Sequence, residues 1–131
     1  MHLRPHPPEF LKGHVCLEPS RELVRQLAQR LFPGVQEAIV LEILDRYGTE
    51  SYERERDRVQ VAVLKLSNGD LERLKTMVSH AKMDYRDTLA AAEYPGEFRA
   101  YLGVERAPAE KERIRQEDRR QYLEWLRTHT I

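Results

Sequence analysis

Three side chains in the middle of the chain, His80, Asp84 and Asp87, have the types and the spacing that could support chemistry. On a helix, residues separated by four and then three positions project to the same side. Two carboxylates and an imidazole there could ligate a divalent ion, or act as a base with its orienting acid. A complete site needs further ligands from a second helix, and the sequence contains no H-E-x-x-H or E-x-x-H pair to supply them. We therefore interpret these residues as part of a solvated helix face, with a metal-dependent or acid–base enzyme as the alternative.

The histidines of the N-terminal region are a second group with metal-binding chemistry. His2, His6 and His14 precede Cys16, the only cysteine of the chain. Their spacing matches no established zinc pattern, and structural zinc needs four well-held ligands. The sequence also contains no glycine-rich phosphate loop and no nucleophile motif. We predict no metal site and no cofactor.

A long helix is expected to position the central candidates. Asp70 can cap it, and apolar residues recur from Leu71 to Ala92 at steps of three and four. Pro95-Gly96 predicts its end, so the helix should extend over about 35 Å at 1.5 Å per residue. Residues 98–104 are then expected to form a loop or a short turn.

Two helices are predicted before it. The first begins at Ser20, a good N-cap, and ends at Pro33-Gly34. The second covers residues 35–47 and is apolar on more than one side. An all-round apolar pattern is typical of a buried helix, so we expect this one to be the central helix of the fold.

Residues 52–67 fit two periods. Val59, Val61 and Val63 alternate as in a strand, and Asn68-Gly69 is a hairpin-turn dipeptide. The same segment also fits one face of a helix. The residues after Asn68-Gly69 are strongly helical and offer no partner strand, so we predict a helix.

The last helix is expected to begin at Pro108, which suits a first turn. Residues 108–121 are so densely charged that they cannot bury much surface without stranding charges. The end is apolar, because Tyr122, Trp125 and Leu126 share one face. That face either folds back on its own domain or reaches a second copy or another protein, with Trp125 as the anchor. Tyr122, Trp125 and Leu126 are the candidate interaction residues.

Composition excludes several classes of function. The 131 residues carry 22 Lys plus Arg and 22 Asp plus Glu, so no global field draws the chain to nucleic acid or anionic lipid. The charge run ERERDR at 53–58 also sums to zero and is expected to open a helix with internal ion pairs. No apolar run approaches the roughly 20 residues of a membrane span, and none near the N-terminus resembles a secretory signal. With its single cysteine the chain is expected to be cytoplasmic, binding neither nucleic acid nor membrane.

The run AKMDYRDTLAAAEYP at 81–95, within the segment 58–95, is similar to a sequence pattern of a known group of proteins. The segment resembles a group of small bacterial proteins of unknown function that share the pattern AK-x-DYRD-x-LA-x-AEYP. The resemblance implies a helical fold and a bacterial, cytoplasmic origin. It implies no activity and no binding residues.

These patterns together predict one all-α domain, an irregular four-helix bundle with an extended N-terminal arm and a charged C-terminal helix. The expected divisions are an arm over residues 1–19, the bundle over 20–104 and the C-terminal helical arm over 105–131. We predict a non-enzymatic protein–protein interaction module, a regulator or adaptor. Its expected contact is a protein partner, or a second copy, through the C-terminal helix.

Overall fold

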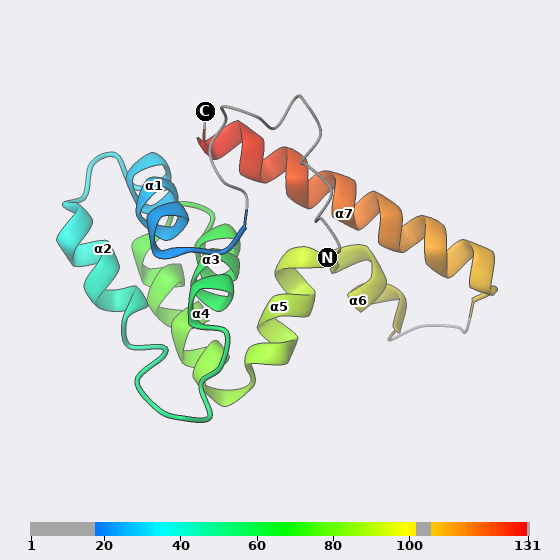
Figure 1. Ribbon diagram of the computed structural model, residues 1–131, viewed down its shortest axis with the longest axis horizontal. Helices are drawn as coiled ribbons and strands as arrows, with labels where there is room; N and C mark the ends of the chain where they lie inside the picture. Colours follow the sequence, from blue (N-terminus) through cyan, green and yellow to red (C-terminus); the bar gives the residue numbers. More distant parts are fainter. Residues whose placement is uncertain (1–17, 102–105, 131) are drawn as a thin grey trace, which may run out of the picture.

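The protein is seen here as a computed structural model that describes residues 18–101 and 106–130 (Figure 1). These residues form seven helices and no strand, so the predicted all-α class is confirmed. The predicted count of four bundle helices is not confirmed. The helices are α1 (Arg21–Leu31), α2 (Glu37–Leu44), α3 (Arg56–Ser67), α4 (Leu71–Met83), α5 (Tyr85–Glu93), α6 (Pro95–Tyr101) and α7 (Pro108–Thr130).

The N-terminal histidines and Cys16 lie outside the described residues, together with most of the predicted arm. The first described helix, α1, begins as predicted, because the Ser20 hydroxyl accepts a hydrogen bond from the Leu23 N–H at 3.1 Å. Within the described part of the chain, none of the helices combines the length and the apolar character that crossing a bilayer requires.

The central helix is α3, which contacts α1, α4 and α5 (Figure 1). The helical interpretation of residues 52–67 is confirmed from Arg56 onward, whereas residues 52–55 precede the helix. The prediction that residues 35–47 form the most buried helix is wrong. In α2 the exposed fraction of Ile39 is still 42%. The valines that alternate like a strand point to different sides of α3, and each side has a neighbouring helix. Its buried residues are Val59, Gln60, Val61, Ala62, Val63, Leu64 and Ser67.

The predicted long helix is divided at Asp84, which corrects the expectation of one helix up to Pro95. The Asp84 backbone is extended (φ −155°, ψ 95°), and its N–H donates to the His80 carbonyl at the end of α4. Its carboxylate accepts hydrogen bonds from the N–H groups of Arg86 and Asp87 at 3.0 and 3.4 Å. Aspartate competes with the helix backbone for such donors, so it ends one helix by capping the next.

A short helix, α6, covers residues 95–101, where a helix end and then a loop or short turn over 98–104 were predicted; residues 102–104 lie outside the described part. Its first N–H groups are satisfied from α7, because the Asp118 carboxylate accepts from Gly96 and Glu97 at 2.9 and 2.8 Å. Asp118 is 4% exposed, so the charged stretch of α7 buries one carboxylate and pairs it fully with backbone donors. A Cβ atom on Gly96 would lie 2.8 Å from this carboxylate, which explains the glycine there.

The end of α7 packs on its own chain. Tyr122 and Leu126 are 8% and 2% exposed and belong to the same core cluster as Leu23 and Leu27 of α1. Of the two predicted outcomes for the apolar tip, folding back is the one observed in the structure.

Candidate functional site

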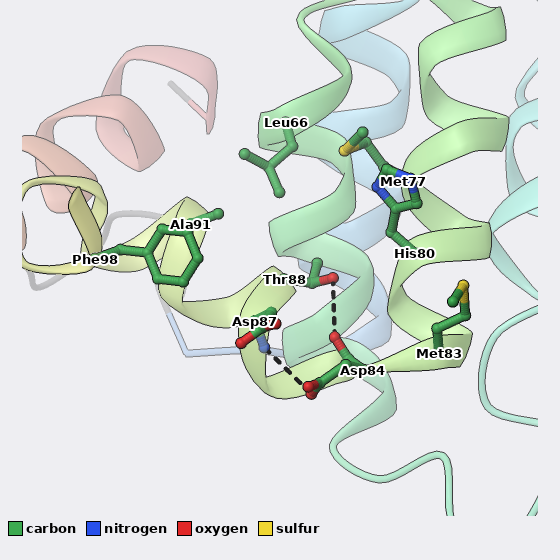
Figure 2. Close-up of a pocket in the computed structure, with 9 residues that line it drawn as sticks. All are labelled: Leu66, Met77, His80, Met83, Asp84, Asp87, Thr88, Ala91 and Phe98. Atoms are coloured by element: carbon green, nitrogen blue, oxygen red, sulfur yellow. Dashed lines mark hydrogen bonds between the residues drawn. The ribbon is translucent and has the colours of Figure 1, made fainter. Parts of the chain in front are cut away.

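A hollow of about 340 Å³ opens to solvent among α4, α5 and α6, next to the last turn of α3 (Figure 2). We call it the α4–α6 hollow. Apolar and sulfur-containing side chains form most of its wall, and the two carboxylates lie at one end (Figure 2). The lining residues are Leu66, Met77, His80, Met83, Asp84, Asp87, Thr88, Ala91 and Phe98.

The hollow brings the three central candidates, His80, Asp84 and Asp87, around one space. They do not converge there. Figure 2 shows the His80 ring extending from α4 well apart from the carboxyl groups of Asp84 and Asp87 at the start of α5. Across the part of the chain that the structure describes, no group of three or more His, Cys, Asp or Glu residues is placed to hold a metal ion.

Asp84 has a structural task in addition to lining the hollow. One carboxylate oxygen caps α5, and the Thr88 hydroxyl donates to the Asp84 carbonyl at 3.4 Å (Figure 2). Asp87 differs, because its side chain is exposed and has neither an ion pair nor a hydrogen bond among the described residues. The chemistry at this end of the hollow is therefore that of two anionic acceptors, one of which has no side-chain partner in the described ranges.

Lys82 belongs to a network on the other side of α4. Its ammonium group donates to Glu53 at 2.7 Å and to the Arg46 carbonyl at 2.8 Å. The Glu53 side chain is 1% exposed and also accepts three backbone N–H groups of residues 48–50 at 2.9 to 3.3 Å. Burial by itself raises the pKa of Glu53, but these hydrogen bonds outweigh it and lower the pKa to about 2.

The charge run at 53–58 is thus organised by long-range contacts, and the expectation of a helix start held by internal pairs is wrong for most of it. Only Glu55 and Arg58 pair within the run, at 3.0 Å. Arg58 also makes two hydrogen bonds to the buried Glu93 carboxylate of α5, at 2.8 and 2.6 Å. The pKa of Arg58 is raised, and the largest cause is its hydrogen bond to the Glu93 carboxylate. Charged residues of the run at 81–95 therefore serve the fold: Lys82, Asp84 and Glu93 all hold helices together.

Met83 is the residue that sequence reasoning missed. It lies at the end of α4, lines the α4–α6 hollow, and is 85% exposed. It also lines a second hollow of about 180 Å³, together with Tyr52, which is 66% exposed. The signal in the sequence was a large apolar residue off the buried stripe, surrounded by charged residues.

The three C-terminal candidate interaction residues differ in their burial. Tyr122 and Leu126 are buried in the core of their own chain, whereas Trp125 is only partly buried. The Trp125 ring lies 6.3 Å from the Tyr122 ring in a stacked arrangement and 5.0 Å from the His129 ring. Of the three, Trp125 alone retains a partly exposed aromatic surface.

Comparison of the chain with protein-family models, with curated proteins and with solved structures gives no match. The family resemblance of residues 58–95 therefore stays an expectation.

Proposed function

We propose that this protein is a non-enzymatic interaction module, a regulator or adaptor that binds a protein partner through the α4–α6 hollow. The observation that carries the proposal is Met83, a large apolar side chain that is 85% exposed on the rim of a mostly apolar hollow. Covering an exposed methionine removes apolar surface from water, which stabilises a complex by about 1.5–3 kcal/mol for a full side chain. We also propose that the protein acts in the bacterial cytoplasm, which its single cysteine and the resemblance of residues 58–95 support.

The composition of the wall supports binding. Met77 and Met83 are unbranched and adaptable, so they fit apolar partners of varied shape, and Phe98 adds a large aromatic surface. An enzyme based on His80, Asp84 and Asp87 is the competing hypothesis. It would need the Asp84 carboxylate for catalysis or for a metal, whereas that group already accepts two N–H groups of α5.

Self-association through the C-terminal helix is a second proposal. It rests on the partly exposed Trp125 ring beside His129, because tryptophan is often an anchor at interfaces. Sedimentation of the full chain and of Trp125→Ala at several concentrations tests it. A dimer that dissociates in the variant with its circular dichroism intact supports it, and a monomer at every concentration contradicts it.

Quantitative affinity capture from the native cell tests the main proposal. The bait is the full chain, compared with Met83→Ser and with Ile39→Ser, which makes the same kind of change at an exposed residue of α2. We expect one protein to be retained by the unmodified chain and by the Ile39 variant, and lost with Met83→Ser. Equal retention on all three baits would contradict an interaction at the hollow.

A further inference from the structure

We propose that the occupant of the α4–α6 hollow is an amphipathic helix of a partner protein, with apolar anchors on one face and Lys or Arg beside them. This inference rests on the proposed function and specifies the chemistry of the partner. The charges around the hollow, its size and the absence of strands among the described residues all favour such a helix.

Negative charge collects at one end of the hollow. Asp84 and Asp87 lie at the start of α5, and the exposed Asp87 carboxylate has no cationic partner in the described part of the chain. The N-terminus of α5 carries roughly half a positive charge, which offsets only part of two carboxylates. His80 is the only basic side chain among the lining residues.

The cations nearest in sequence are directed elsewhere. Lys82 is held by Glu53 and by the Arg46 carbonyl on the opposite side of α4. The Arg86 guanidinium lies over the Tyr85 ring, 5.8 Å from its centre. The Asp87 carboxylate is therefore available to a Lys or Arg of another molecule, which would form a charge-assisted hydrogen bond with it, whereas Asp84 already caps α5.

A cation lies beside Leu66, near the other end of the hollow, although it does not line the wall. Arg73, in the first turn of α4, donates through Nε to the Leu66 carbonyl at 2.6 Å and is exposed. Figure 2 shows Leu66 and the two aspartates at opposite ends of the space. A bound segment with its basic residue near Asp87 would therefore bind in one direction only, because the reverse direction brings like charges together.

The size and the surroundings of the hollow favour a helix. A volume of about 340 Å³ is at the small end of ligand pockets, which suits the anchor side chains of a helix. An extended peptide usually adds a strand to a sheet edge, and the described residues contain no strand. A helix instead docks through side chains at i, i+3 and i+4 into an apolar groove between helices.

Fluorescence anisotropy with two designed peptides tests the inference on the full chain. The probes are a labelled amphipathic helix with leucine on one face and lysine on the other, and the same helix with glutamate in place of lysine. We expect the lysine peptide to bind at least tenfold more tightly than the glutamate peptide. Asp87→Lys should weaken it at least fivefold, whereas Glu42→Lys, the same change at a 74% exposed residue of α2, should change it less than twofold.

Several results would overturn the inference. Equal binding of the two peptides would show that the partner is not cationic. The proposal of an interaction at the hollow would still stand, so the two proposals can fail separately. Equal weakening by Asp87→Lys and Glu42→Lys would place the peptide elsewhere. A tenfold gain in affinity after removal of residues 1–17 would show that the chain covers its own hollow, and a dimer dissociated by Asp87→Lys would make a second copy the occupant. If Asp87→Lys loses its helical circular dichroism signal and so does not fold, Asp87→Asn, which keeps the side-chain size, replaces it in the binding assay.

Discussion

Replacing Glu53 with glutamine should destabilise the protein by roughly 3 kcal/mol at pH 7. Glutamine has nearly the shape of a neutral glutamic acid, so the substitution reports the energy that ionisation of Glu53 adds to the fold. The pKa of this group is lowered from 4.5 to about 2, and each pKa unit is worth about 1.36 kcal/mol. The source of the energy is the set of hydrogen bonds from Lys82 and the backbone of residues 48–50, which the buried carboxylate accepts.

The effect of Glu53→Gln should depend on pH in a specific window. The pKa is lowered in the folded state, so the stabilisation is fully present above about pH 5. It is lost as the pH falls from 4.5 towards 2, where the carboxyl group protonates in the folded state too. At pH 3 the difference between the wild-type and variant free energies of unfolding should have fallen to about 1 kcal/mol.

Urea denaturation followed by circular dichroism at pH 7 and pH 3 measures both numbers. Glu50→Gln is the matched control, because Glu50 is an exposed residue of the same loop. Its effect should stay within about 0.5 kcal/mol at either pH. A loss for Glu53→Gln that is the same at pH 7 and pH 3, or no larger than that of the control, would refute the assignment of this energy to the ionised carboxylate.

Three further substitutions and one titration test other parts of the structure. Asp84→Ala should lower the free energy of unfolding by about 1 kcal/mol through loss of the α5 cap, and an unchanged urea midpoint would contradict this. Asp118→Ala leaves two N–H groups of α6 without their acceptor and should cost about 2 kcal/mol; wild-type stability would argue against that contact. Leu126→Ala should cost about 2–5 kcal/mol by the same assay, whereas a loss below 1 kcal/mol would remove the end of α7 from the core. Calorimetry with zinc, manganese or magnesium should show no site tighter than about 10 μM, and tight one-to-one binding abolished by Asp84→Ala would favour the enzyme hypothesis.

Local signals in the sequence were sufficient for several elements. Ser20 begins α1 because a serine hydroxyl can reach an N–H group three residues later, which requires no other part of the chain. Pro108 begins α7 for a similarly local reason. The choice of helix for α3 was also decided locally, by the helical segment after Asn68.

The features that sequence reasoning missed depend on distant partners. The acceptor for the first N–H groups of α6 is Asp118, which follows Gly96 by 22 residues. The division of the long helix at Asp84 places α5 against α3, where Glu93 meets Arg58, 35 residues earlier in the chain. Hydrophobic periodicity describes one helix at a time. A continuous helix and two helices divided at Asp84 both fit the same periodicity, and it is the contacts with distant residues that select the second.

The candidate site was predictable only in part. The spacing of His80, Asp84 and Asp87 identified the right region, because all three line the α4–α6 hollow. Their i, i+4, i+7 relation assumed a continuous helix, which the extended backbone of Asp84 interrupts. The importance of Met83 depends on its exposure, which is a property of the folded chain.

Site-specific photo-crosslinking from the rim of the hollow tests the central claim most directly. Benzoyl-phenylalanine is introduced at Met83 in the native cell and, as the control, at Ile39 on α2, which is also an exposed apolar position. We predict a crosslinked product with one defined protein from position 83, absent from position 39 and reduced when Asp87→Lys is added. The same products from both positions, or none from position 83, would contradict an interaction module that works through the α4–α6 hollow.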